Sequence, residues 1–182
     1  MELQVFIPGL NETMKIFLIG FMGSGKTTIG RRLVEQTGFD FLDTDRFIEI
    51  RQGKSIAEIF VQYGELAFRE MERNLLLELQ QLEYTVVSTG GGMPCYADNM
   101  DIMLSCGKVV YLKILPQTLA SRLIRSNTER PLINGKTENE LQQYIMEKLA
   151  ERESFYCRAH IIIQAENLSM DELLQSLKLM KT

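Results

Sequence analysis

The eight residues from Gly20 to Thr27, GFMGSGKT, match the pattern G-x-x-x-x-G-K-[S/T] of loops that bind nucleotide phosphates. A glycine-rich backbone can point its N–H groups at phosphate oxygens, and a following helix N-terminus adds partial positive charge. Lys26 can reach the β- and γ-phosphates, and Thr27 can offer its hydroxyl to Mg²⁺. The pattern therefore predicts a bound nucleoside triphosphate together with Mg²⁺. The predicted nucleotide-binding residues are Gly23, Ser24, Gly25, Lys26, Thr27 and Thr28.

The alternative for this loop is a glycine turn that binds no ligand. Such a turn would not need a strand before it, or a lysine, a hydroxyl and a helix after it, and all of these agree here. The loop alone does not identify the phosphate acceptor, because motor, switch and transport proteins share it.

Two carboxylates, Asp43 and Asp45, follow a short apolar run and are separated only by Thr44. One carboxylate could serve the metal and the other could meet the hydroxyl group that accepts the phosphoryl group. The alternative is that one of them caps the N-terminus of a helix around residues 47–50. Capping does not exclude a catalytic role.

A triple glycine, Gly90 to Gly92, directly follows another apolar run and would permit a close approach of backbone to a ligand. Arg69 lies in the sequence FREME with Glu72 three residues on, a spacing that can hold a guanidinium group in place. Spacing alone favours an ordinary surface ion pair for Arg69, and a plain loop is the alternative for the glycines.

Further arginines lie in the second half of the chain. Arg130 follows Arg122 and Arg125 in a polar segment, which suggests a lid that closes over the transferring phosphoryl group. A solvated loop is the alternative. Arg152, taken alone, is typical of a charge on a helix surface.

The elements that must position these residues alternate along the chain. Capping patterns begin helices at Ser55, Thr137 and Ser169, Gly38 ends the helix predicted over 27–36, and one helix should stop near Gly64. The apolar runs predict strands at 15–19, 39–42, 84–88, 108–115 and 159–164. This alternation predicts an open, mostly parallel α/β sheet, whose ligands lie beyond the carboxyl ends of the strands. The phosphate loop, Asp43 and Gly90 all follow a strand, as that rule requires.

Composition narrows the class of protein. The 182 residues are 45% hydrophobic and carry a net charge of −4, which suits one globular domain and argues against a nucleic-acid partner. No apolar run approaches the roughly 20 residues that cross a bilayer. The three cysteines lack disulfide or zinc spacing, so we expect reduced thiols and a cytoplasmic location, and a single histidine disfavours a His-based triad. We expect a monomer, with residues 14–182 as the domain and residues 1–13 as an extension of uncertain origin.

Taken in order, the phosphate loop, Asp43-Thr44-Asp45, FREME, STGGGM, RPL at 130–132 and ERESFYCRA resemble the shikimate kinase family over about residues 14–178. The phosphate loop is common to many families, whereas the ordered set is specific. The resemblance implies ATP-dependent phosphorylation of the shikimate 3-hydroxyl, a step toward chorismate and the aromatic amino acids. It also implies a P-loop α/β fold like that of nucleoside monophosphate kinases. Helices would flank a five-stranded parallel sheet of order 2-3-1-4-5, with a lid at about residues 122–137.

The same resemblance implies roles for single residues. Asp45 would hydrogen-bond the acceptor hydroxyl as the candidate base, and Asp43 would reach Mg²⁺ together with Thr27. Arg69, oriented by Glu72, and Arg152 would grip the substrate carboxylate, for which a guanidinium fork is suited. The backbone of Gly90, Gly91 and Gly92 would line the substrate site.

The lid arginines complete the implied site. Arg130 would meet substrate and γ-phosphate as a catalytic group, and Arg122 would lie near the adenine, with Arg125 as its competitor. The nearest rival function is a kinase for another small polyol acid such as gluconate, which should not need Arg69, Arg152 and the three glycines together. A non-catalytic nucleotide-binding module is a rival from another class, although it predicts the loss of a catalytic residue and all of them are present.

Overall fold

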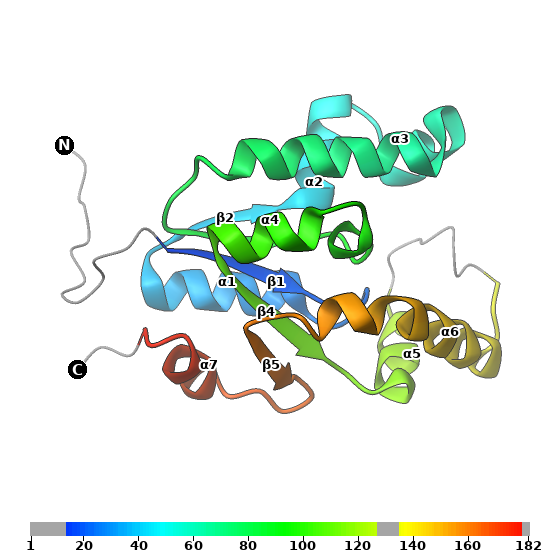
Figure 1. The fold of residues 1–182 in the computed structure, drawn as a ribbon. Helices are drawn as coiled ribbons and strands as arrows, with labels where there is room; N and C mark the ends of the chain where they lie inside the picture. Colours follow the sequence, from blue (N-terminus) through cyan, green and yellow to red (C-terminus); the bar gives the residue numbers. More distant parts are fainter. Residues whose placement is uncertain (1–13, 127–134, 180–182) are drawn as a thin grey trace.

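The computed structural model describes residues 14–126 and 135–179. Its centre is one parallel sheet in the order β2-β3-β1-β4-β5, which confirms the predicted order (Figure 1). In chain order the strands are β1 (Lys15–Ile19), β2 (Asp40–Asp43), β3 (Thr85–Ser88), β4 (Lys108–Lys113) and β5 (Ile161–Gln164). Every residue of β1 is buried, as expected for a central strand covered on both faces.

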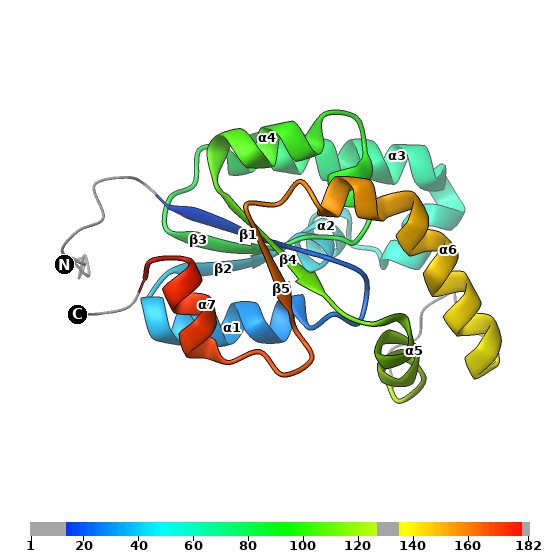
Figure 2. The same ribbon diagram turned by 60° about the horizontal axis from the view of Figure 1, so that its bottom comes forward.

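The helices form a layer on each face of the sheet (Figure 2). Helices α3 (Ile56–Leu79) and α4 (Asn99–Cys106) cover one face, and α1 (Lys26–Thr37) and α7 (Met170–Ser176) cover the other. Helices α5 (Pro116–Ile124) and α6 (Glu138–Tyr156) pack together beyond the carboxyl end of β4, and α2 (Thr44–Gln52) directly follows β2. A short 3₁₀ helix, Met93–Cys95, follows the glycine run.

Local signals account for most helix ends. Gly38 ends α1 in the left-handed conformation, with φ 76°, and reciprocal capping boxes begin α3 at Ser55 and α6 at Thr137. The helix predicted to stop near Gly64 is interrupted at that glycine, where φ of 81° and ψ of 169° are not helical, and a second helical stretch follows within α3. Helix α4 was not predicted, and β4 ends at Lys113 rather than at residue 115.

The hydrophobic core lies between the sheet and these two helix layers. It contains the central strand residues together with inward residues such as Leu33 of α1, Leu75 of α3 and Ile145 of α6. Within the ranges that the structure describes, no helix combines the length and apolarity needed to span a bilayer. The core holds the strands in place, and the carboxyl ends of the strands position the loops that follow them.

Candidate active site

The phosphate loop connects β1 to α1 and has the backbone conformation that its glycines allow. Gly20, Gly23 and Gly25 have φ angles of 142°, 83° and 93°, a range that other residues rarely adopt. The Lys26 ammonium group folds back over the loop and donates to the carbonyl oxygens of Gly20 at 2.9 Å and Phe21 at 3.0 Å. These contacts hold the lysine at the loop that it is predicted to serve.

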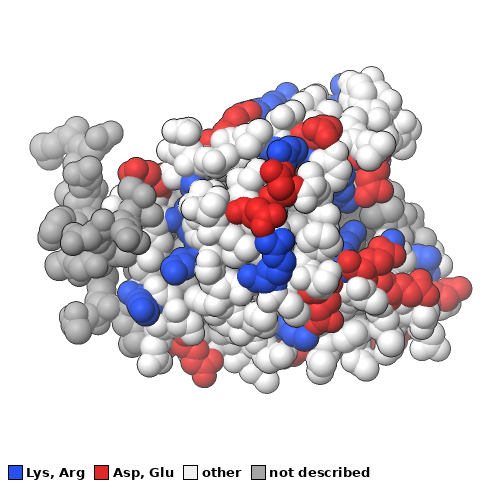
Figure 3. Space-filling model, in the orientation of Figure 1, with Lys and Arg blue, Asp and Glu red and all other residues white. Residues whose placement is uncertain are grey.

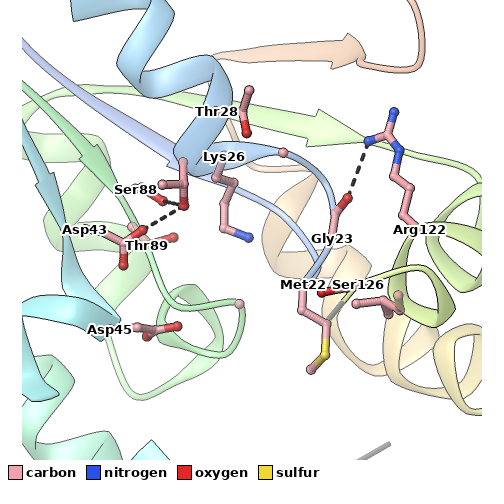
Figure 4. A pocket seen from close by; sticks show the side chains of 14 residues that line it. Met22, Gly23, Lys26, Thr28, Asp43, Asp45, Ser88, Thr89, Arg122 and Ser126 are labelled. Carbon is pink, nitrogen blue, oxygen red and sulfur yellow. Dashed lines mark hydrogen bonds between the residues drawn. The ribbon is translucent and has the colours of Figure 1, made fainter. Parts of the chain in front are cut away.

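A cavity of about 350 Å³ opens over this loop, and side chains from several strand ends line it. Asp43 and Asp45 lie on one side of it, Arg122 lies on the other, and Lys26 lies between them (Figure 4). The cavity is also lined by the predicted residues Gly23, Gly25, Thr27, Thr28 and Gly91, whereas the buried Ser24 lines a second cavity. The predicted substrate residues that do not line the first cavity are Arg69, Gly90, Gly92 and Arg152. The structure thus brings the predicted nucleotide and acceptor groups to one cavity.

Asp43 performs two local tasks. Its Oδ1 atom accepts from the Arg46 N–H at 3.2 Å as the N-cap of α2, which is the alternative that capping chemistry suggested. Its Oδ2 atom accepts from the Thr27 hydroxyl at 2.8 Å, and the Ser88 hydroxyl lies 3.4 Å from that of Thr27 (Figure 4). Sequence reasoning missed Ser88, although a serine that ends an apolar strand is a usable signal.

This oxygen cluster is chemically suited to Mg²⁺. Hydroxyl and carboxylate oxygens are the ligands that a small hard cation accepts, and Mg²⁺ commonly takes one or two protein ligands plus phosphate oxygens and water. Among residues 14–126 and 135–179, no group of three or more His, Cys, Asp or Glu side chains could hold a metal. Thr27 and Asp43 fit the ion.

Asp45 and Glu72 place two carboxyl groups against Gly90. Each has one buried oxygen, Oδ1 or Oε1, without a hydrogen-bond partner among the described residues, and a Cβ at Gly90 would overlap both atoms. Burial and the nearby Asp43 carboxylate raise the pKa of Asp45. Burial raises the pKa of Glu72 to about 7, although Arg69 opposes the rise. The glycine is therefore needed for the close approach of these groups.

Arg69 is not the surface ion pair that spacing alone favoured. Its side chain is 14% exposed and donates to Glu72 Oε2 at 2.6 Å, so the predicted i,i+3 pair is present. A second bond runs to Glu65 Oε1 at 2.8 Å, a partner that was not predicted. The guanidinium group lies so close to Gly92 that a Cβ there would come within 2.6 Å of it. The triple glycine thus makes room for charged side chains.

Arg152 also faces the site from α6. Its guanidinium carbon lies 5.7 Å from the centre of the Phe21 ring in the phosphate loop, and Nη1 would lie 3.6 Å from a Cβ at Gly91. The Tyr156 hydroxyl, one helical turn later, donates to the Gly91 carbonyl at 2.5 Å. Sequence reasoning assigned no role to Tyr156, because the bond joins residues that are 65 positions apart.

Arg122 rather than Arg125 lies at the nucleotide side. Its Nη1 atom donates to the Gly23 carbonyl at 3.4 Å, and it lines both the first cavity and a second of about 440 Å³. That second cavity extends from the phosphate loop to residues 165–168 after β5, which were not predicted to line a site. Arg125 is exposed and lines neither of these cavities. Arg130 and residues 127–134 of the predicted lid lie outside the described residues.

Comparisons with known proteins agree with this geometry. A family model for shikimate kinase matches residues 22–180. A shikimate kinase from Parabacteroides distasonis is 44% identical over 154 residues, or 85% of this chain and 89% of that protein. The crystal structure of a shikimate kinase from Bacteroides thetaiotaomicron has 39% identity and a TM-score of 0.88, covering 92% of this chain and 99% of that one.

A further solved structure, a shikimate kinase from Acinetobacter baumannii in complex with shikimate, has 36% identity and a TM-score of 0.81 over 91% of both chains. A gluconokinase from Sinorhizobium meliloti is only 16% identical, with a TM-score of 0.51 over 90% of this chain and 89% of that one, and shares the fold alone.

Proposed function

The chain belongs to the shikimate kinase family, and on that premise we propose that it transfers the γ-phosphoryl group of ATP to the 3-hydroxyl of shikimate. The product is shikimate 3-phosphate, an intermediate toward chorismate and the aromatic amino acids. One observation carries the assignment of the substrate side: the almost buried Arg69 lies against Gly92, and the adjacent Gly91 lines the same cavity as the phosphate loop.

The nucleotide lies along the loop between β1 and α1. Backbone N–H groups of the loop and the Lys26 ammonium group bind the β- and γ-phosphates, and the helix N-terminus adds favourable charge. Thr28 and Arg122 line both the first and the second cavity, and the second cavity accepts the adenosine part of ATP. Thr27 and Asp43 would hold Mg²⁺, which when bound would neutralise charge on the phosphates.

The acid substrate lies on the other side of Asp45. Arg69 and Arg152 bind its carboxylate, and the backbone of Gly90, Gly91 and Gly92 lines its ring. Positive charge must be local for this purpose, because a chain of net charge −4 has to bind two anionic ligands. Glu72 keeps the guanidinium group of Arg69 in place by the 2.6 Å ion pair.

Asp45 accepts a hydrogen bond from the 3-hydroxyl and thereby orients the hydroxyl oxygen toward the γ-phosphorus. Phosphoryl transfer depends mainly on positioning and charge stabilisation, so orientation is the first role of this carboxylate. Burial raises the pKa of Asp45, and a carboxylate with a raised pKa is a better proton acceptor at neutral pH. Arg130 enters from the predicted lid at 122–137 and meets substrate and γ-phosphate.

Surface charge and the cysteines bear on the partners and the cellular location of the enzyme. On the face shown in Figure 3, acidic and basic side chains are interspersed, which supports a protein without a nucleic-acid partner. All three cysteines are free thiols in the structure, which agrees with the reducing cytoplasm. We place the enzyme there as a monomer, with no membrane partner and with residues 14–182 as one kinase domain.

A coupled ADP-release assay with Mg·ATP tests this function. Shikimate, gluconate and nucleoside monophosphates are compared as acceptors, and mass spectrometry identifies the product. We expect turnover with shikimate only. Phosphorylation of gluconate without shikimate would replace the proposal with the rival kinase, and ATP binding without any acceptor-dependent ADP release would support the non-catalytic module.

A further inference from the structure

We propose that Tyr156 is a positioning residue for the acid substrate: its hydroxyl joins α6 to the carbonyl of Gly91 and thereby sets Arg152 relative to the glycine run. This inference rests on the proposed function, because it assigns Arg152 and the glycine run to the substrate carboxylate and ring. It adds a residue that touches neither substrate nor nucleotide.

The hydrogen bond itself is well defined. The Tyr156 side chain is completely buried, and its hydroxyl donates to the Gly91 carbonyl oxygen at 2.5 Å. A buried hydroxyl without a partner is costly, and a phenol has only one proton to donate. Because the phenol donates its proton in the hydrogen bond to the Gly91 carbonyl, the oxygen can otherwise only accept hydrogen bonds.

The guanidinium group of Arg152 is chemically suited to donate to that oxygen. Arg152 lies one helical turn before Tyr156 on α6, so the two side chains share a face of the helix. Nη1 of Arg152 would lie 3.6 Å from a Cβ on Gly91, the same residue whose carbonyl accepts from Tyr156, so both side chains meet at Gly91. Burial raises the pKa of Tyr156, and the neighbouring Arg152 guanidinium group lowers it in part. Guanidinium groups only donate hydrogen bonds, the phenol can accept one and donate one, and the Gly91 carbonyl accepts. The donor and acceptor roles of the three groups therefore match.

The Gly91 end of this chain of contacts lies at the centre of the site. A Cβ on Gly91 would lie 3.4 Å from the Gly20 carbonyl oxygen and 3.6 Å from the Met22 nitrogen, so Gly91 also touches the phosphate loop. Its neighbours, Gly90 and Gly92, lie against catalytic and substrate-binding side chains. A shift of Gly91 would therefore move the substrate wall relative to Arg152.

The ring of Tyr156 has a separate, structural task. It packs against the Tyr111 ring with 5.0 Å between centroids, and Leu141, Ile145 and Leu149 anchor the rest of α6 in the core. Removal of the hydroxyl alone leaves this apolar anchoring intact. Tyr156→Phe is thus a variant that should fold, and Tyr111→Phe is its matched control, since it removes a hydroxyl from the same ring pair.

The test is steady-state kinetics of the full chain with Mg·ATP and shikimate. For Tyr156→Phe we expect the KM for shikimate to rise by about 5- to 30-fold, the range expected when one hydrogen bond at a buried site is lost, with the KM for ATP within about twofold. Tyr111→Phe should leave both values unchanged. In an Arg152→Lys background the added effect of Tyr156→Phe should be much smaller, because the two changes act on one interaction.

Three outcomes would overturn the inference. They are an unchanged KM for shikimate in Tyr156→Phe, an equal rise for both ligands, and full additivity with Arg152→Lys. The first or second together with a lower melting temperature would assign Tyr156 a structural role only. A wild-type chain without shikimate-dependent ADP release would contradict the proposed function itself, and this inference with it.

Discussion

The guanidinium group of Arg69 has two carboxylate partners, and they differ in the ease with which a substrate could replace them. Glu72 is completely buried, whereas the side chain of Glu65 is 62% exposed. An exposed ion pair contributes little to stability, so an incoming carboxylate can displace Glu65 at small cost while Glu72 stays in place. The substrate acid would then occupy the outer side of the fork.

Arg69→Lys should weaken shikimate binding far more than ATP binding, because a lysine cannot form two parallel bonds to a carboxylate. We expect the KM for shikimate to rise by about 10- to 100-fold and the KM for ATP to stay within about twofold. The matched control is Arg73→Lys, one turn along the same helix, where the arginine pairs with Asp98. Equal losses for both ligands would count against a carboxylate clamp.

Lys26→Ala should nearly abolish turnover, since no other change removes so much positive charge from the phosphate loop. Loss of one group that stabilises developing charge lowers kcat by about 10²- to 10³-fold. Lys148→Ala, a lysine paired with Glu151 on α6, is the control and should retain full activity. A near-normal kcat for Lys26→Ala, measured by ADP release, would refute its assigned role.

Glu72 makes stability depend on pH. Burial and the nearby Asp45 hold its pKa at about 7, above its ordinary value of 4.5, against the opposing effect of Arg69. Between these values the folded chain retains a proton that the unfolded chain has released, so the free energy of unfolding should fall as pH rises from about 4.5 to about 7. The raised pKa of Asp45 acts in the same direction.

Urea denaturation at pH 5 and pH 7 measures this effect. We expect the free energy of unfolding of the wild type to fall by roughly 1–3 kcal/mol more than that of Glu72→Gln, which cannot titrate. Glu78→Gln on the same helix is the control, because the pKa of Glu78 is lowered by its pair with Arg51 and its stabilising effect is lost only at more acidic pH. Parallel slopes for wild type and Glu72→Gln would disprove the assignment.

At the scale of elements, the close packing of α1 on the sheet depends on Gly30. A Cβ there would lie 2.6 Å from Cε2 of Phe41 in β2 and 3.2 Å from Cδ1 of Leu18 in β1. Helix-interior glycine to alanine changes ordinarily stabilise a protein by about 0.5–1 kcal/mol. Here the added methyl group overpacks the interface between helix and sheet.

Gly30→Ala should therefore destabilise the protein by about 1–3 kcal/mol, the usual cost of overpacking. The midpoint of urea denaturation measures it, with Gln36→Ala on the exposed side of α1 as the control for helix propensity. A stabilised Gly30→Ala variant would mean that Phe41 yields without cost and that α1 is not held this tightly.

The elements also explain which parts of the site could be predicted. The phosphate loop, Asp43 and the glycine run follow strand ends, and parallel strands bring their carboxyl ends to one edge, so their convergence follows from the pattern of strands. The break of α3 at Gly64 was predicted from the glycine itself. The contact of Glu65 with Arg69 was not, although an i,i+4 spacing on a helix permits it.

At the scale of the whole molecule, the unpredicted contacts join distant segments. The bond from Tyr156 to Gly91 and the place of Ser88 beside Thr27 depend on how α6 and β3 lie over the core, which no local pattern encodes. The distribution of charge was also only partly predictable from the sequence. The net charge of −4 indicated local positive groups, but only the fold places Arg69 next to Gly92 and Arg152 next to Gly91.

A crystal structure of the chain with shikimate and a non-hydrolysable ATP analogue is the most direct measurement of the arrangement proposed here. The account predicts that guanidinium nitrogens of Arg69 and Arg152 lie within hydrogen-bonding distance of the shikimate carboxylate. It also predicts the 3-hydroxyl between Asp45 and the γ-phosphate, with the triphosphate along Gly23 to Thr28. Shikimate bound away from Gly91, or with its carboxylate out of reach of both arginines, would contradict the account.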